Sequence, residues 1–141
     1  MATSMNAVAV GLFNKLTGNS ALTTLLANGT ASVFEMSAPE GEDPPYVVFQ
    51  AQAPSTPEHT FAGVAMERAL YTIKAVTESH SAAGAGTIAD KIDDAIVDQA
   101  LTVTGYTHLE TRRYQNVDYV EVVDGKRFNH RGATYRVRVR L

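Results

Sequence analysis

The sequence contains no cysteine. This absence excludes a disulfide scaffold, a thiol nucleophile and a thiolate metal site, and it fits a reducing compartment. A long apolar segment is also missing. The N-terminal run without a charge, Met1 to Asn14, is shorter than the ~20 residues of a membrane-spanning helix. The first basic residue is Lys15, so we expect neither a membrane span nor a signal peptide.

Charged residues make up only 19% of the 141 residues, whereas hydrophobic residues make up 45%. This is the composition of a folded globular protein. A chain of this length can bury a core without help from metals or disulfides. Because no linker, internal repeat or low-complexity segment divides it, we expect a single domain over residues 1–141.

The charges are distributed unevenly along the chain, whose net charge is −3. Residues 1–102 contain four Lys or Arg and eleven Asp or Glu, whereas residues 103–141 contain eight and four. Such a split indicates either a basic surface for nucleic acid or a body whose ends attract each other in an assembly. Composition alone leaves both interpretations open.

Apolar residues at three- and four-residue steps predict three helices. The first two are short and N-terminal, and glycines 18 and 29 are placed to end them in a left-handed conformation. The third follows a small-residue lead-in, Ser79 to Gly86, and runs to about Gln99. The apolar positions are Met5, Val8, Ala9, Leu12 and Leu16, then Leu22, Leu25 and Leu26, then Ile88, Ile92, Ala95 and Ile96.

Alternating side chains predict strands at Ala31–Met36, Tyr46–Ala53, Glu67–Thr77, Thr107–Tyr114 and Ala133–Leu141. The stretch 119–130 is ambiguous, although Asp124-Gly125 is a hairpin turn signal. Segments rich in Pro and Gly predict loops at Ser37–Pro45 and Pro54–Gly63. Strands grouped around one long helix predict an α+β fold with a mostly antiparallel sheet. We expect the long helix and the N-terminal helix pair to pack on one face of it.

Three aspartates, Asp90, Asp94 and Asp98, fall on the side of the third predicted helix that is opposite its apolar face. A straight helix spreads these carboxylates over two turns, unlike the mixed loop oxygens that calcium prefers. A solvated face is therefore favoured over a metal site. An acidic contact surface for a basic partner is the other interpretation.

Three arginines, Arg136, Arg138 and Arg140, share one face of the last predicted strand with Thr134, and apolar residues occupy the other face. Arginines without partners cannot enter an apolar core. The face is therefore solvated and paired with acids of a neighbouring strand, or it meets nucleic-acid phosphate, or it forms salt bridges between subunits.

Signs of catalysis are weak. The four histidines, at positions 59, 80, 108 and 130, lack the spacing of a helical zinc site, and there is no nucleophile-elbow motif. The segment from Gly84 to Ala89 fits G-x-G-x-x-A, but it does not directly follow a strand as a dinucleotide site requires. We interpret it as a small-residue loop that enters a helix. We expect no enzyme, no cofactor and no bound metal.

The stretch from Tyr119 to Val137 reads Y-x-E-x-x-D-G-x-R-x-x-H-x-G-x-x-Y-R-V. Together with PPYVVFQ at 44–50, ALYTIKA at 69–75 and the helix at 89–100, it is similar to the tail-completion proteins of long-tailed bacteriophages. These are also called tail-terminator or tail-to-head joining proteins. The resemblance covers almost the whole chain.

The resemblance implies a structural virion protein of the head–tail neck, assembled in the host cytoplasm. Such subunits form a ring, usually a hexamer, that caps the tail tube protein and docks onto the head-tail connector proteins. Double-stranded DNA passes through the lumen without sequence-specific binding. The alternatives are another ring protein of the same virion, either a head-completion or a tail tube subunit, or a small basic-faced nucleic-acid-binding domain.

Ring contacts join two different surfaces of neighbouring subunits. The acidic helix face and the arginine face are candidates for these two surfaces, or for the surface that faces DNA. Their residues are Asp90, Asp94 and Asp98 on the helix, and Arg136, Arg138 and Arg140 on the strand.

Overall fold

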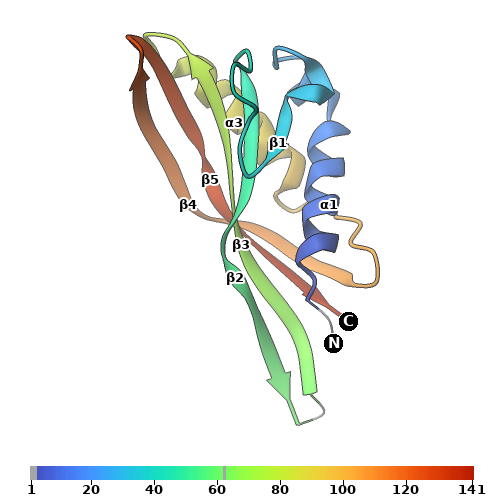
Figure 1. Ribbon diagram of the computed structural model, residues 1–141. Helices are drawn as coiled ribbons and strands as arrows, with labels where there is room; N and C mark the ends of the chain where they lie inside the picture. The colour runs from blue at the N-terminus through green and yellow to red at the C-terminus, as the bar shows by residue number, and fades with distance from the viewer. Residues whose placement is uncertain (1–2, 62) are drawn as a thin grey trace.

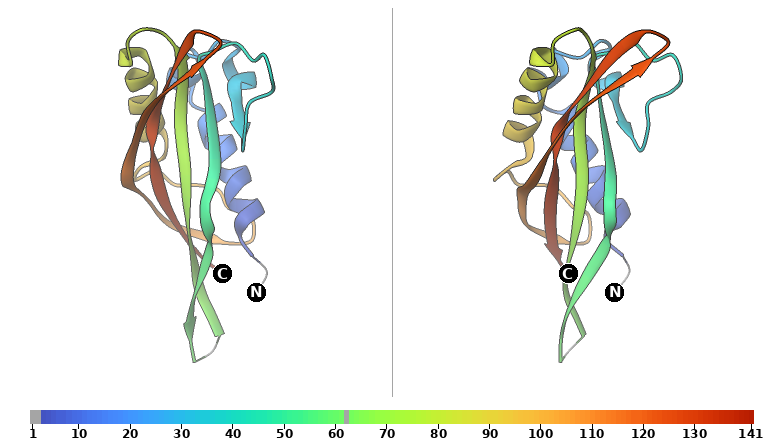
Figure 2. Two further views of the ribbon diagram at one scale, coloured as in Figure 1. Left: turned by 60° about the vertical axis from the view of Figure 1, so that its left-hand side comes forward. Right: turned by 90° about the vertical axis from the view of Figure 1, so that its left-hand side faces the viewer.

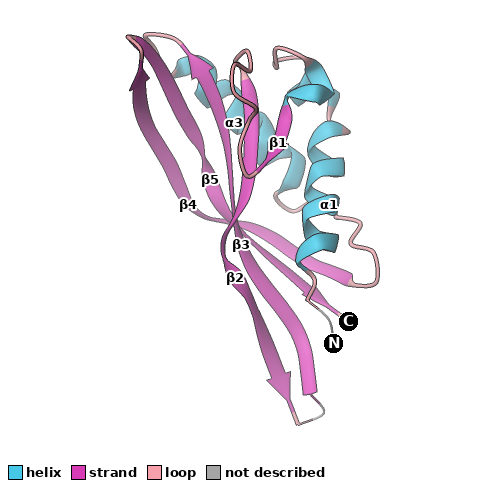
Figure 3. Cartoon of the chain, in the orientation of Figure 1, coloured by secondary structure: helices cyan, strands magenta, loops and turns pink. Residues whose placement is uncertain are grey.

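The computed structural model describes residues 3–61 and 63–141. Its elements, in chain order, are α1 (Met5–Thr17), α2 (Ser20–Thr23), the 3₁₀ helix η1 (Gly29–Ser32), β1 (Val33–Glu35), β2 (Tyr46–Thr60), β3 (Gly63–Glu78), α3 (Ala83–Ile96), β4 (Thr107–Val123) and β5 (Lys126–Arg140). Figure 1 shows the helices gathered on one side of a long, twisted sheet, and Figure 3 separates helices from strands by colour. The predicted α+β class is confirmed.

The sheet has five strands in the order β1-β2-β3-β5-β4. All neighbouring pairs are antiparallel except β1 and β2, which are parallel over three residue pairs. The β4–β5 ribbon therefore forms one edge of the sheet, and the short strand β1 lies at the other. Since residues 103–141 carry most of the arginines, the charge split of the sequence becomes a basic edge on the sheet.

The core lies between the helices and one face of β3 and β5. This is the apolar face that the alternating side chains of these strands predict. On β3, Tyr71, Ile73 and Ala75 are at most 2% exposed, and on β5 Tyr135 and Val137 are 1% exposed. Helices α1 and α3 supply the opposite layer with Leu12, Leu16, Ile88, Ile92 and Ile96. Leu141 departs from its predicted place on the apolar face: it follows the end of β5 and is 67% exposed.

The predicted loop from Pro54 to Gly63 is wrong. Strands β2 and β3 continue past the helices as a two-stranded arm, seen at the bottom of Figure 1. The pairing is irregular, with register shifts between Ala51 and Ala53 and again before Thr56. Prolines lack the N–H group that a central strand needs, but they are tolerated on an edge strand and at bulges. Ala62, within the predicted loop, lies outside the described residues.

The third helix begins and ends earlier than the pattern predicts. It starts at Ala83 rather than after Gly86, and it ends at Ile96 rather than near Gln99. The glycines at 84 and 86 therefore lie in its first turn, so the interpretation of this segment as a loop is wrong. Asp98 has a positive φ of 56° and lies beyond the helix, which removes it from the predicted acidic face.

The hairpin turn at Asp124-Gly125 is confirmed. Both residues have positive φ, 51° and 76°, as a two-residue turn between antiparallel strands requires. The flanking strands reach this turn, so β4 extends to Val123, well past the predicted end at Tyr114. Because β4 is mostly exposed here, its polar and apolar residues do not follow the alternation of a half-buried strand.

The start of α1 is held by a residue of the sheet. The backbone N–H and hydroxyl of Ser4 donate hydrogen bonds to the carboxylate of Glu67 on β3, at 3.0 and 2.6 Å. A negative charge at this position also stabilises the helix N-terminus. At the other end Gly18 has a φ of −79°, so the predicted left-handed stop there is wrong. No helix in the described part of the chain is long and apolar enough to cross a membrane.

Candidate functional site

The arginine face of β5 lies on the side of the sheet away from the helices, where it meets acids of neighbouring strands. Glu110 on β4 lies 3.3 Å from Arg138, 3.7 Å from Arg136 and 2.9 Å from Arg112. Arg138 also lies 3.7 Å from Glu58 at the base of the arm. The hydrogen bond from Arg138 holds the pKa of Glu110 below its usual value. Two of the three predicted arginines thus have partners within the chain.

Arg140 differs from its two neighbours on β5. It is exposed, and no carboxylate of the described residues forms a salt bridge with it. The Nε atoms of Arg136 and Arg138 are buried without hydrogen-bond partners among the described residues. The two inner arginines therefore belong to a network that links strands, whereas Arg140 is available to a molecule outside the chain.

The predicted acidic face on α3 keeps two of its members. Asp90 and Asp94 are exposed on the helix, on the opposite side of the sheet from the arginine face, so one subunit does not bring the two sets together. The adjacent Asp93 makes the intramolecular contacts instead. It accepts a hydrogen bond from the Tyr135 hydroxyl at 3.1 Å and lies 3.7 Å from Arg113. Burial and the charge of Asp93 raise the pKa of Tyr135.

A second cluster, formed by Lys74, Tyr119, Glu121 and His130, explains the first part of the C-terminal motif. The ring of Tyr119 stacks on His130 with centroids 4.4 Å apart and planes 8° from parallel. Lys74 donates a hydrogen bond to the Tyr119 hydroxyl, and Glu121 lies 3.6 Å from His130. Burial, and next the charge of Lys74, lower the pKa of His130, while Glu121 opposes the shift. The cluster joins β3 to the β4–β5 ribbon.

The rest of the motif connects the ribbon to the start of α3. Asn129 donates hydrogen bonds to the carbonyls of Ser79 and Ser81, at 2.9 and 3.2 Å. Arg131 makes a two-point contact with Asp118, at 3.2 and 3.0 Å, and reaches the carbonyl of Ala82 at 3.5 Å. Sequence reasoning recognised the motif by resemblance, but the tertiary partners of these side chains are distant in sequence and gave no local signal.

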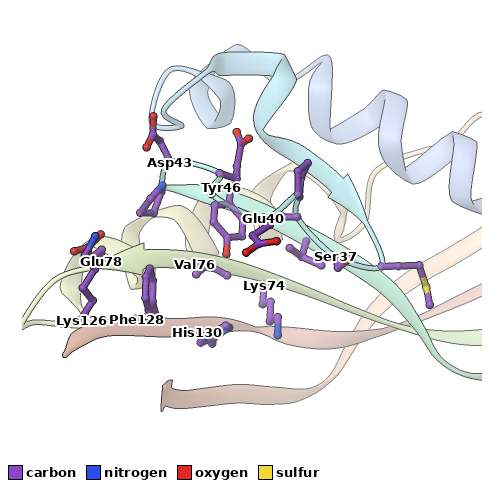
Figure 4. A pocket seen from close by; sticks show the side chains of 17 residues that line it. Ser37, Glu40, Asp43, Tyr46, Lys74, Val76, Glu78, Lys126, Phe128 and His130 are labelled. Carbon is purple, nitrogen blue, oxygen red and sulfur yellow. The ribbon is translucent and has the colours of Figure 1, made fainter. Parts of the chain in front are cut away.

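A hollow of about 480 Å³ separates the loop after β1 from the outer face of the sheet. Figure 4 shows Ser37 and Glu40 of the loop on one side, and Lys74, Phe128 and His130 of the strands on the other. Its lining carries charges of both signs over an apolar floor. A surface that combines charged and apolar side chains in this way suits contact with another protein.

The arrangement of the polar side chains is that of a structural subunit. The glycines of the G-x-G-x-x-A segment lie within α3, whereas a dinucleotide site needs them in the turn between a strand and a helix. Within residues 3–61 and 63–141, no three His, Asp or Glu side chains lie close enough to hold a metal ion. The polar side chains instead link one element to another, as in a structural subunit.

The chain belongs to the family described as tail completion protein gp17, whose model matches residues 10–141. It is therefore a structural tail protein of the phage virion. The fold is similar to that of a chain in the solved virion of a native gene transfer agent particle, with a TM-score of 0.75, 16% identity and full coverage of both chains. A second solved structure has a TM-score of 0.60 at 14% identity over 96% of each chain. No curated protein matches the sequence.

Proposed function

We propose that the protein forms a ring of six subunits. The ring caps the tail tube and joins it to the head connector. Membership of the tail completion family supports a structural role in the phage tail. The ring would stop growth of the tube, occupy the neck of the virion after assembly in the host cytoplasm, and leave a lumen for double-stranded DNA. We further propose that residues 1–141 act as one domain and that the subunit needs no catalysis or cofactor.

The shape of the subunit is the observation that carries the proposal. Figure 1 shows the β2–β3 arm projecting from one end of the molecule, whereas the Ser37–Pro45 loop and the Asp124-Gly125 turn lie toward the other end. A protein that joins a tube to a connector needs two different contact regions at opposite ends of its long axis. The arm and the loop meet this requirement, and polar segments of this kind commonly carry binding function.

The charge pattern favours a passage for DNA over a DNA-binding site. Glu110 and Glu58 offset much of the charge of Arg136 and Arg138, which leaves fewer free cations to release counterions from phosphates. Exposed aromatic side chains for base stacking are also few along this face. We therefore propose that DNA passes the ring without sequence-specific binding.

A complementation experiment tests the function. A phage that lacks this protein should accumulate filled heads and separate tails whose tubes have lost length control. Addition of the purified protein to such an extract should restore joined, infectious particles.

The alternatives give different particles in the same experiment. A tail tube subunit would leave no tubes at all, and a head-completion protein would leave tails of normal length beside heads that lose DNA. A nucleic-acid-binding protein would leave the virion structure intact. Any of these three results would contradict the proposed function.

A further inference from the structure

Exposed apolar side chains concentrate on two elements. Of the thirteen large hydrophobic residues that are exposed in the described part of the chain, nine lie on α1 or β4. They are Met5, Val10 and Phe13 on α1, and Leu109, Tyr114, Tyr119, Val120, Val122 and Val123 on β4. Single exposed apolar residues are normal on any protein surface, but groups of them mark interaction sites. The two elements are therefore candidate interaction surfaces.

The outer face of α1 is unusual for a surface helix because it carries no acidic or basic residue. Asn6, Val10, Phe13 and Asn14 are exposed and fall within one arc of about 100° at 3.6 residues per turn. The only charged residue of the helix is Lys15. A helix that faces water normally has charged residues on that side, whereas the centre of a protein interface is depleted of them.

Strand β4 is an open edge of the sheet. Its 17 residues pair only with β5, and no other described strand lies along its outer side. From Gln115 to Val123 the pairing with β5 has no register shift, and the strand contains neither lysine nor proline. Long edges without such protective features pair readily with another chain. Tyr114, 61% exposed, stands beside this segment.

The two surfaces lie on opposite flanks of the subunit. Figure 1 shows α1 on the right and the upper part of β4 on the left, and the left-hand view of Figure 2 shows the middle of β4 on the left and α1 on the right. The flanks are also opposite in charge. On the basic ribbon, the side chains of Arg112 and Arg113 are more than half exposed, although they lie near Glu110 and Asp93 of the same chain. At the other edge, Glu35, Glu40 and Asp43 are exposed on and after β1. One chain thus carries both halves of a head-to-tail contact.

We propose that the outer face of α1 in one subunit packs against β4 of the next subunit, which brings the basic ribbon near the acids beside β1. This inference rests on the proposed ring and specifies its contact surface. A heterologous contact of this kind closes a ring when the rotation closes. It replaces the pairing of the acidic helix face with the arginine face that the sequence suggests, because the Arg138 side chain is held by Glu110 and Glu58 and is only 30% exposed, whereas those of Arg112 and Arg113 are 65% and 54% exposed.

Cysteine cross-linking tests the contact, since the chain has no cysteine of its own. Val10→Cys and Tyr114→Cys replace exposed side chains, so both variants should fold, and a thermal melt checks this. The variants are mixed, assembled on tail tubes and treated with a short bismaleimide. Asp94→Cys, at an exposed position of α3, replaces Tyr114→Cys in the matched control.

We expect a covalent dimer in the mixture of Val10→Cys with Tyr114→Cys, at least tenfold more than in the control mixture or with either variant alone. The double variant should give a ladder of cross-linked species up to the full ring. Tyr114→Cys linking to itself would indicate a two-fold contact and overturn the inference. Rings on tube ends without the mixed cross-link would also overturn it, while leaving the proposed function intact. Absence of rings on the tubes would contradict both.

Discussion

Gly132 is the glycine at which an added Cβ atom would meet the closest neighbouring atom. A Cβ atom at this position would lie 2.1 Å from the carbonyl oxygen of Ile73 and 2.6 Å from the Cα of Lys74. Both atoms belong to the backbone of β3, so they cannot move aside as a flexible side chain would. The motif position occupied by Gly132 is thus explained by the close approach of β5 to β3.

We predict that Gly132→Ala destabilises the protein by roughly 3 kcal/mol or more, because overpacking against backbone is among the costly substitutions. Gly84→Ala is the matched control, since a Cβ there meets nothing within 4 Å. It should raise stability by about 0.5–1 kcal/mol, as expected for Gly to Ala within a helix. Urea unfolding of the two variants measures both effects. Equal stability of the variants would contradict this account of Gly132.

His130 should make the fold sensitive to acid. Its pKa in the folded state lies below the ordinary value of 6.5, so the unfolded chain binds a proton more readily. Stability from this residue is therefore complete above about pH 6.5 and is lost as the pH falls below that value toward the lower folded pKa. We predict that His130→Phe, which preserves an aromatic ring against Tyr119, reduces the loss of stability between about pH 7.5 and 5.5.

His80→Phe serves as the control for this experiment, because His80 is exposed. Its pH dependence of thermal unfolding should match that of the unchanged protein. If His130→Phe also shows an unchanged pH dependence, the buried histidine does not contribute to acid sensitivity.

Single residues show where sequence reasoning succeeds. The turn at Asp124-Gly125 was predictable because its backbone conformation depends on the two residues themselves. The roles of Glu67, Asp93 and Asn129 were not, because each depends on a partner more than forty residues away in the sequence.

At the scale of the elements, the salt bridges of Arg138 link three strands. This side chain connects β5 to Glu110 of β4 and to Glu58 of β2, so it fixes the arm relative to the edge ribbon. We predict that Arg138→Glu lowers the free energy of unfolding by about 1–3 kcal/mol, because a hydrogen bond to a charged partner is lost and three carboxylates become neighbours. Thermal melts measure the change.

Arg140→Glu is the control for charge reversal on the same strand face. Because Arg140 is exposed, its effect on unfolding should stay within about 0.5 kcal/mol. The double variant Arg138→Glu with Glu110→Arg should recover part of the stability that the single change removes. If Arg138→Glu is as stable as Arg140→Glu, the network does not hold the strands together.

The arm provides a separate prediction about joining. Replacing residues 59–65, at the tip of the arm, with a two-residue turn between the paired residues Glu58 and Met66 should leave the body folded, because the core lies between the helices and the other half of the sheet. Such a variant should unfold at nearly the same temperature as the unchanged protein but fail to restore joined particles in the phage extract. Full restoration would show that the arm has no part in joining.

The elements that the sequence predicted well are those with one buried face. Strand β3 and the second half of β5 alternate cleanly because helices cover one side of them. The arm and the β4–β5 ribbon lack such a cover, so the amino-acid pattern there has no period to detect, and the prolines of β2 resemble loop signals. The first turn of α3 was missed because glycine is a poor helix former, although here Gly86 leaves room for Arg131.

At the scale of the whole molecule, the two flanks of the subunit differ in charge, and its two ends carry different projecting segments. The strand order turns the charge split of the sequence into a basic edge, which composition alone could not place. The arm and the loop after β1 occupy opposite ends of the long axis (Figure 1). Unlike flanks suit a head-to-tail ring, and unlike ends suit a ring that lies between two different partners.

Averaged electron micrographs of tail tube ends, with and without the purified protein, test the central proposal most directly. We predict one additional ring, consistent with six copies of the 15.2 kDa chain, at a single end of each tube, and no further growth from that end. Tubes that keep growing from the occupied end, or protein distributed along the whole tube, would contradict the proposal that this protein terminates the tail.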